Sequence, residues 1–163
     1  MSKNQHGFRA GYSINTAINS FLNITYNNVS KKEPTLISYI DLRKAFDTVN
    51  HNVLLSKLVD QFNFGISSLN WIRSFLSNRH LTSNFLGKKS NKYQVTAGVP
   101  QGSVLGPVLF SLMINDCSDV IRDANIVLYA DDTAVLDGGP DLANTVKNME
   151  KKSVLHVTLV QTQ

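Results

Sequence analysis

The chain has 163 residues, of which 42% are hydrophobic, and this is enough for one domain with a substantial core. Its net charge of +4 is compatible with a polyanionic partner but does not require one. The single cysteine excludes an internal disulfide framework, and the scattered histidines lack the spacing of a zinc site.

Two features of the chain concern its location. The first residues are polar and no apolar signal-peptide core follows them, so we expect an intracellular protein of the cytoplasm or the nucleus. The longest apolar run, residues 104–114, is shorter than the roughly 18 residues that cross a bilayer, so no membrane partner is expected. Because Cys117 lies in an apolar stretch of the chain, we expect it to be a buried structural thiol and not a nucleophile.

The first part of the chain predicts a helix and then a strand. Apolar residues with helical spacing follow Ser13, a suitable N-cap; they are Ile14, Ala17, Ile18, Phe21 and Leu22. Residues 27–34 are polar and predict a loop. Residues 35–40 predict a strand, and Asp41 stands at its end.

The middle of the chain predicts two helices and a hairpin. One helix should run from an N-cap at Asn50 to about Asn63, closed by Gly65, and the next should start at Ser67 or Ser68 and end near residues 78–79. Residues 81–86 and 93–96 should form a hairpin around a turn at residues 88–91.

The last part predicts two more helices. A glycine-bearing loop, residues 98–103, should lead into an apolar helix over about residues 103–115 that is interrupted or bent near Pro107. A further helix should follow Gly138 and Gly139, with Pro140 at its first position.

Two adjacent carboxylates, Asp131 and Asp132, separate strand-forming residues 126–129 from residues 134–136. This pattern predicts a β-hairpin with acids at its tip. Carboxylates ~4 Å apart repel by roughly 4 kcal/mol at an effective dielectric constant of about 20, a cost that a cation or protonation removes. The alternative is a solvated polar turn without a ligand.

If the fold joins Asp41 to Asp131 and Asp132, three carboxylates meet at strand ends. Magnesium prefers such oxygen ligands and keeps positions open for water and phosphates. Two metal ions ~3.5–4 Å apart stabilise the attacking and the leaving oxygens of a phosphoryl displacement. The pattern therefore indicates nucleotidyl transfer.

Three stretches together resemble the reverse transcriptases of non-LTR (LINE-type) retrotransposons. They are DLRKAFDTVNH at residues 41–51, GVPQGSVLGP at residues 98–107 and YADD at residues 129–132. They occur in the order and with the spacing of that family, and a family-like QHGFR precedes them at residues 5–9. The resemblance covers about residue 5 to about residue 150.

The resemblance implies an α+β fold: a right-hand polymerase palm, which is an antiparallel sheet backed by helices, with partial fingers and the thumb missing. The whole chain would be a single partial reverse transcriptase domain. Residues 5–34 would belong to the fingers, residues 35–152 to the palm and adjoining fingers, and residues 153–163 to a tail that diverges from the family.

The resemblance also implies roles for single residues. Asp41 and Asp131 match the catalytic carboxylates that hold the metals, and Asp132 matches the third acid. The substrate-binding matches are Arg9 for the triphosphate, Phe46 under the incoming sugar, and Gln101 with Gly102 at the template base pair and nucleotide. A ring at Phe46 would exclude a 2′-hydroxyl; the alternative is a core aromatic.

The implied function is an RNA-directed DNA polymerase that extends a primer 3′-hydroxyl with two Mg²⁺, for which Mn²⁺ can substitute. Its partners would be an RNA template, a DNA primer, deoxynucleoside triphosphates and the remainder of a retrotransposon polyprotein. One alternative is an inactive truncated remnant that at most binds nucleic acid. An RNA-dependent RNA polymerase is disfavoured by Phe46 and by Ala130 before the paired acids.

For several other residues we expect a structural role, although a functional role is the alternative. Asp47 is expected to bond locally at the junction between strand and helix, rather than to be a fourth acid. Trp71 is expected in the core or in a groove, with base stacking as the alternative. The lysines of the middle hairpin, Lys88, Lys89 and Lys92, are expected at a solvated tip, with phosphate contact as the alternative.

Overall fold

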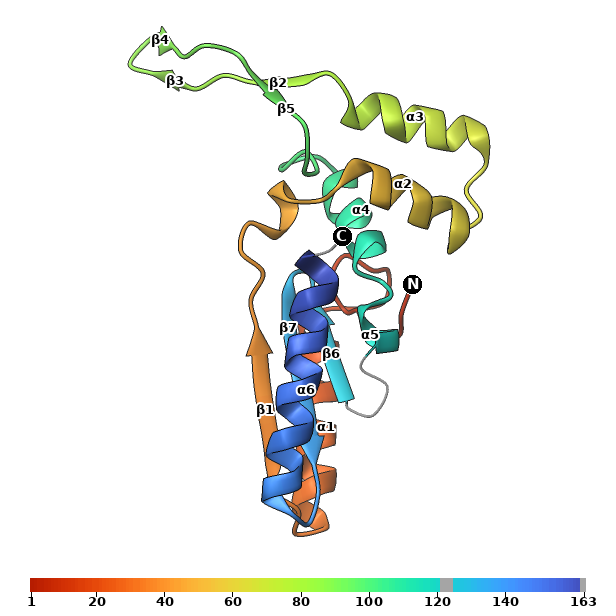
Figure 1. Cartoon of the computed structure of the whole chain (residues 1–163), viewed down its shortest axis with the longest axis vertical. Helices are drawn as coiled ribbons and strands as arrows, with labels where there is room; N and C mark the ends of the chain where they lie inside the picture. Colours follow the sequence, from red (N-terminus) through yellow and green to blue (C-terminus); the bar gives the residue numbers. More distant parts are fainter. Residues whose placement is uncertain (121–124, 162–163) are drawn as a thin grey trace. The chain divides into compact units, whose positions relative to one another are not determined.

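The computed structural model describes residues 1–120 and 125–161 of the chain (Figure 1). The chain divides into two compact units. The first combines Met1–Arg43 with Ile114–Gln163, and the second is Lys44–Met113. Residues from both ends of the chain therefore form one unit. The assignment of the whole chain to a single partial domain stays a prediction.

The first unit is built on a three-stranded antiparallel sheet in the order β1-β7-β6. The strands are β1 (Thr35–Ile40), β6 (Asn125–Tyr129) and β7 (Asp132–Gly138). Both the expected strand after the first loop and the expected acid-tipped hairpin are therefore present. The helices are α1 (Ile14–Ser30), α5 (Cys117–Val120) and α6 (Leu142–Gln161).

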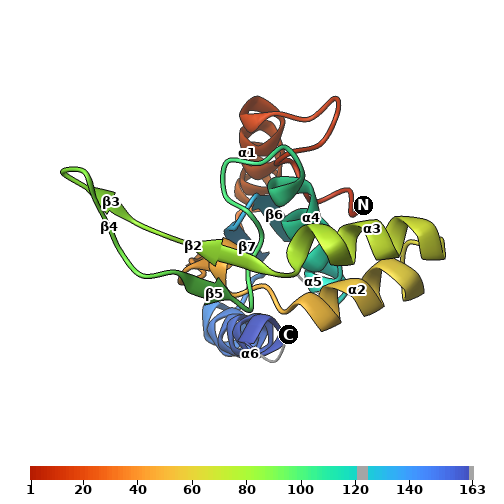
Figure 2. The ribbon, with the colours of Figure 1, turned by 90° about the horizontal axis from the view of Figure 1, so that it is seen from above.

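The sheet of the first unit is covered by a helix on each face. Figure 2 shows α1 and α6 on opposite sides of β6 and β7. Since successive strand residues point to opposite faces, Val127 and Leu136 pack with Ala17 of α1. Leu128 and Val135, which are fully buried, pack instead in the cluster that contains Met149 of α6. This double cover places the hairpin that carries the acids in the core of the unit.

The first helix begins where the sequence predicts it. Ser13 accepts a hydrogen bond from the Thr16 backbone, and the Thr16 hydroxyl accepts one in return from the Ser13 backbone, which is a capping box. The helix continues to Ser30, so the prediction that a loop begins at residue 27 was wrong. Polar residues on the solvent side of an amphipathic helix carry no signal of where it ends.

The second unit contains a short 3₁₀ helix and three α-helices. They are η1 (Ala45–Asp47), α2 (His51–Asp60), α3 (Ile66–Leu76) and α4 (Leu105–Met113). Its buried side chains include Leu54 and Leu58 of α2, Leu76 of α3 and Phe110 of α4. Lys57 is also buried and donates a hydrogen bond to the Met113 carbonyl at 2.7 Å, which satisfies its ammonium group.

Two predicted helix boundaries in the second unit need correction. Asn50 caps α2 as expected, but the helix ends at Asp60. The left-handed backbone of Asn63, with φ of 52°, is incompatible with a longer helix. The helix α3 begins at Ile66, directly after Gly65, so neither Ser67 nor Ser68 is its cap.

The middle hairpin has a different turn from the predicted one. Strands β2 (Arg79–Leu81) and β5 (Tyr93–Val95) pair, and β3 (Asn84–Phe85) pairs with β4 (Lys88–Lys89), so the ladders follow one another along an arm (Figure 1). Leu86 and Gly87 form the turn with positive φ values of 49° and 78°. This is the backbone of the tight hairpin turn that glycine favours, and it places two of the lysines in a strand.

Two predictions about proline need correction. Pro107 does not interrupt α4, which is one helix from Leu105 to Met113 with the proline in its first turn, where a missing amide hydrogen costs no intrahelical bond. A bend near Pro107 stays a prediction. Pro140 precedes α6 instead of opening it. Asp141 caps this helix, because its side chain accepts from the Ala143 amide at 2.9 Å and its carbonyl accepts from the Thr145 amide at 3.0 Å.

No helix among residues 1–120 and 125–161 is long and apolar enough to cross a membrane. The thiol of Cys117 is buried, with 1% of the residue exposed, as the sequence predicts.

Candidate active site

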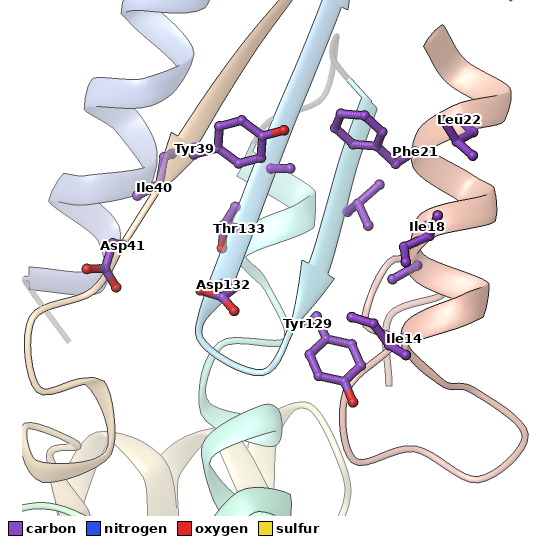
Figure 3. Close-up of a pocket in the computed structure, with 13 residues that line it drawn as sticks. Ile14, Ile18, Phe21, Leu22, Tyr39, Ile40, Asp41, Tyr129, Asp132 and Thr133 are labelled. Atoms are coloured by element: carbon purple, nitrogen blue, oxygen red, sulfur yellow. The ribbon is translucent and has the colours of Figure 1, made fainter. Parts of the chain in front are cut away.

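Two of the three predicted catalytic acids lie at adjoining ends of paired strands. Ile40 pairs with Thr133 at the last position of the β1-β7 ladder. Asp41 follows Ile40 and Asp132 precedes Thr133, so the two acids flank the last pair of the ladder. Figure 3 shows them at the ends of neighbouring strands. They belong to the same side of the sheet because the alternation of side chains has a period of two residues.

The third acid, Asp131, occupies the tip of the hairpin. Tyr129 pairs with Asp132, so only Ala130 and Asp131 form the turn. Ala130 has a positive φ of 56°, in the left-handed region that glycine normally occupies in such turns. Asp131 is half-buried, whereas Asp132 and Asp41 are exposed. The tight turn keeps the two neighbouring acids on one short segment.

A groove of about 540 Å³ runs from these acids along the α1 side of the sheet. Asp41 and Asp132 line one end of it (Figure 3). The rest of the lining is mainly apolar and includes Ile14, Ile18, Phe21, Tyr39 and Tyr129. The rings of Phe21 and Tyr39 stack with centroids 6.4 Å apart across the groove. Asp131 is not among the lining residues.

The arrangement of the three acids can be compared with the way in which proteins bind Mg²⁺. Among the residues that the structure describes, no three His, Cys, Asp or Glu side chains gather closely enough to form a complete metal-binding group. Magnesium does not need such a cage, since it usually takes one or two carboxylates and completes its shell with water and substrate phosphates. Asp41 and Asp132 at one open groove fit this type of binding, and Asp131 on the adjoining turn is a further oxygen donor.

Arg9, expected at the triphosphate, is engaged close to the chain's start. Its guanidinium donates to the Ser2 carbonyl at 2.6 Å and lies over the ring of Tyr12, 4.1 Å from the centroid. Tyr12 in turn makes an edge contact with the His6 ring. Burial, and to a lesser extent the charge of Arg9, lower the pKa of His6 below its ordinary value of 6.5.

The other expected substrate residues belong to the second unit. Phe46 is half-buried and stacks on Phe110, with ring centroids 4.5 Å apart. Gln101 donates from its side-chain amide to the carboxylate of Asp47 at 2.7 Å. Asp47 therefore bonds to a residue 54 positions away, and the prediction that it bonds locally was wrong. Gly102 is exposed and has a φ of 79°.

The loop that carries Gln101 is held by close backbone contact. The Val99 amide donates to the Phe46 carbonyl at 2.8 Å, and the Gly98 amide donates to the Val49 carbonyl at 2.8 Å. Arg79 anchors the same loop by donating to the Gly98 carbonyl at 2.5 Å, and partial burial lowers the pKa of this arginine. The segment after β1 and the glycine-bearing loop thus form one piece within the second unit.

Trp71 is 58% exposed, so it does not belong to the core. It stacks on Phe75 with centroids 5.8 Å apart and lines a pocket of about 440 Å³ with Leu105 and Leu109, which agrees with the groove-lining alternative. The lysines of the middle hairpin, Lys88, Lys89 and Lys92, are all exposed, as a solvated arm requires. Whether they contact phosphates stays a prediction.

The sequence is similar to known polymerases. Residues 1–156 match the family described as reverse transcriptase (RNA-dependent DNA polymerase). The chain is 35% identical over 141 residues to the RNA-directed DNA polymerase from mobile element jockey of Drosophila melanogaster. It is 34% identical over 146 residues to the probable RNA-directed DNA polymerase from transposon BS of the same species, and 31% identical over 137 residues to that from transposon X-element.

The matches cover most of this chain but a small part of each relative. They span 82% of the chain for jockey and 81% for transposon BS, and 15% of each of those two proteins. The chain is a member of the reverse transcriptase family, and its relatives confirm the resemblance to LINE-type retrotransposon enzymes.

One residue at this site was missed from the sequence. Gln5 belongs to the family-like stretch at residues 5–9, from which no role for this side chain follows. The structure places it at 1% exposure in contact with the turn that carries the paired acids. The signal that was available is a polar residue two positions before a glycine in a stretch typical of the family.

Proposed function

We propose that this chain carries the catalytic part of an RNA-directed DNA polymerase that adds deoxynucleotides to a primer 3′-hydroxyl. The observation that supports it most is the position of Asp41 and Asp132 beside the last β1-β7 pair and in one groove, in a chain of the reverse transcriptase family. The first unit is then the centre of the palm, since it is an antiparallel sheet backed by helices. The chain spans about 15% of the length of the curated relatives it matches.

Asp41, Asp131 and Asp132 would hold two Mg²⁺, or Mn²⁺ in their place. When bound, such a pair of ions stabilises the attacking and the leaving oxygens of an in-line phosphoryl displacement. The chain contributes by fixing its carboxylates on paired strand ends before substrate arrives, so that little reorganisation is needed. The open groove beside Asp41 and Asp132 leaves room for phosphates and water.

Phe46 would select deoxynucleotides over ribonucleotides. Its ring is backed by Phe110, which limits its movement. A ring held in this way cannot retreat from a 2′-hydroxyl without breaking a stacked contact, and this supports a steric role. Gln101 and Gly102 would meet the nascent base pair and nucleotide, and Arg9 the triphosphate, whose oxygens suit a guanidinium fork.

The RNA template and the DNA primer would bind through their phosphates, for which the net charge of +4 is favourable. The experiment is extension of a DNA primer on an RNA template by the whole chain, at about 50 mM salt to strengthen phosphate contacts. Wild type should extend the primer with Mg²⁺ and deoxynucleotides, and Asp41→Asn should abolish extension. Binding of the primer-template without extension would overturn the proposal and support the inactive remnant.

A further inference from the structure

The residues before the first helix run alongside β6. Gln5 forms a parallel bridge with Leu128, flanked by two backbone hydrogen bonds. The His6 amide donates to the Leu128 carbonyl at 2.8 Å, and the Leu128 amide donates to the Asn4 carbonyl at 2.9 Å. The start of the chain is thus fixed beside the strand that leads into the paired acids.

The Gln5 side chain reaches the turn itself. Its oxygen accepts from the Ala130 amide at 3.2 Å and from the Gly7 amide at 2.8 Å. Its nitrogen donates to the Ala130 carbonyl at 3.3 Å. One side chain therefore pairs with both backbone polar groups of the residue that precedes Asp131.

Glutamine suits this position better than either glutamate or asparagine. Glutamate would lack the donor for the Ala130 carbonyl, and at 1% exposure it would bury a negative charge beside two aspartates. Asparagine has the same groups but is shorter by one methylene. The turn requires an uncharged side chain that accepts a hydrogen bond from the Ala130 amide and donates one to the Ala130 carbonyl.

Gly7 adds a second close contact with the turn. A Cβ atom at Gly7 would lie far inside van der Waals contact with the Ala130 nitrogen and 3.1 Å from the Ala130 Cα. The segment can approach the turn so closely only because this residue has no side chain. Ala130 in turn has the left-handed φ of 56°, which an alanine rarely adopts unless its surroundings impose it.

We infer that Gln5 is a positioning residue of the polymerase site: it clamps the strained turn at Ala130 and so fixes the direction of the Asp131 and Asp132 carboxylates toward metal and nucleotide. The inference rests on the proposed function, because Gln5 can position metal ligands only if Asp131 and Asp132 hold the metal ions. It extends the site to a residue 125 positions away from the turn. Partners that orient metal ligands in this way change metal affinity by about 10–100-fold when they are removed.

The test is Mn²⁺ binding to the whole chain, measured by titration calorimetry on wild type, Gln5→Met and Val135→Ala. Methionine keeps the volume of glutamine and removes its hydrogen bonds. Val135 is fully buried in the same hairpin and pairs with Ile126 and Ser38, several residues away from the turn, so its substitution is the control for lost stability. Thermal unfolding of each variant gives the temperature at which all three are folded.

At that temperature we expect Gln5→Met to bind Mn²⁺ about tenfold more weakly than wild type, and Val135→Ala to bind it with unchanged affinity. Equal affinity of wild type and Gln5→Met would overturn the inference and leave the proposed function intact. If wild type itself does not bind Mn²⁺, the metal site of the proposed function fails, and the positioning role fails with it.

A Gln5→Met chain that does not fold is covered by a second measurement on wild type and Gln5→Asn. Asparagine keeps an uncharged amide but is shorter by one methylene, so the backbone bridge to Leu128 should remain while the side chain no longer reaches both polar groups of Ala130. Hydrogen exchange at the tip of the hairpin should therefore become faster and Mn²⁺ affinity should fall. Identical exchange and affinity in the two proteins would contradict the clamp.

Discussion

Ile40 of β1 pairs directly with Thr133 of β7, and this pairing brings the two neighbouring acids, Asp41 and Asp132, to the same end of the sheet. A shift of the register by one residue would move the side chains of β1 to the opposite face. The buried alternation on both strands opposes such a shift, because Ile40 and Val135 must face α6. The position of the acids is therefore set by the hydrophobic core.

The contact between Gly98 and Asp47 predicts a large loss of stability on substitution. Gly98 has a φ of 84°, and a Cβ there would lie 2.7 Å from the Asp47 Cα and carbonyl oxygen. We expect Gly98→Ala to lower the free energy of unfolding by about 2–4 kcal/mol, from backbone strain and overpacking together. Urea unfolding measures the loss.

Gly102→Ala is the matched control for that change. Gly102 has a similar φ of 79°, but nothing lies within 4 Å of a Cβ at this position. Only the conformational strain of about 1–2 kcal/mol should remain. Equal losses for the two variants would show that the contact with Asp47 does not exist in solution.

The ion pair between Lys152 and Asp137 predicts a difference between neighbouring lysines. The two charged groups are 2.6 Å apart and each side chain is 14% exposed. Lys152→Met leaves a largely buried carboxylate without this partner, and we expect a loss of about 1–3 kcal/mol in the free energy of unfolding. Lys151→Met, at an exposed position, should change it by less than about 0.5 kcal/mol. Chemical denaturation of the two variants checks this, and equal stabilities would show that the pair contributes nothing.

The lowered pKa of His6 predicts acid sensitivity of the first unit. Burial favours the neutral ring in the folded chain, so the unfolded chain binds more protons below its ordinary pKa of 6.5. The stability contributed by His6 is full above that pH and is lost as the pH falls through the lower, folded pKa. Thermal unfolding between pH 7.5 and about 5 should therefore show a steeper loss for wild type than for His6→Asn. Parallel pH profiles of the two proteins would contradict the burial of a neutral histidine.

The stacked ring of Phe46 predicts a change in sugar selection. Phe46→Val should raise the incorporation of ribonucleotides relative to deoxynucleotides by about tenfold or more, because the clash with the 2′-hydroxyl disappears. Ile72→Val, a core substitution in α3, should leave the ratio unchanged while costing a similar order of stability. Single-nucleotide extension with each substrate gives the ratio. An unchanged ratio in Phe46→Val would assign this ring to the core.

The parts of this structure that the sequence predicts are those with local signals. The strand at residues 35–40 and the hairpin around Asp131 follow from short apolar runs bounded by polar residues, and Ser13 and Asn50 are N-caps of the residue types that favour this position. The end of α1 at Ser30 was missed because a polar sequence on the solvent face does not mark a helix end.

The parts that the sequence does not predict depend on contacts between distant residues. The bond from Gln101 to Asp47 forms only because the glycine-bearing loop packs on η1, and local propensity favours a cap for an aspartate at that junction. No periodic pattern in the sequence predicts the hydrogen bonds between Gln5 and Ala130, because these two residues are 125 positions apart. Such pairs are visible only once the fold is known.

The most direct test of the metal site is titration calorimetry of the whole chain with Mn²⁺, comparing wild type with Asp41→Asn and Asp131→Asn. Asp60→Asn, which removes an exposed carboxylate at the end of α2, is the control for a general loss of charge. We expect wild type and the control to bind Mn²⁺ with the same affinity, and both active-site variants to bind it at least about tenfold more weakly. Equal binding by all four proteins, or binding by none, would contradict the claim that these acids form a metal site.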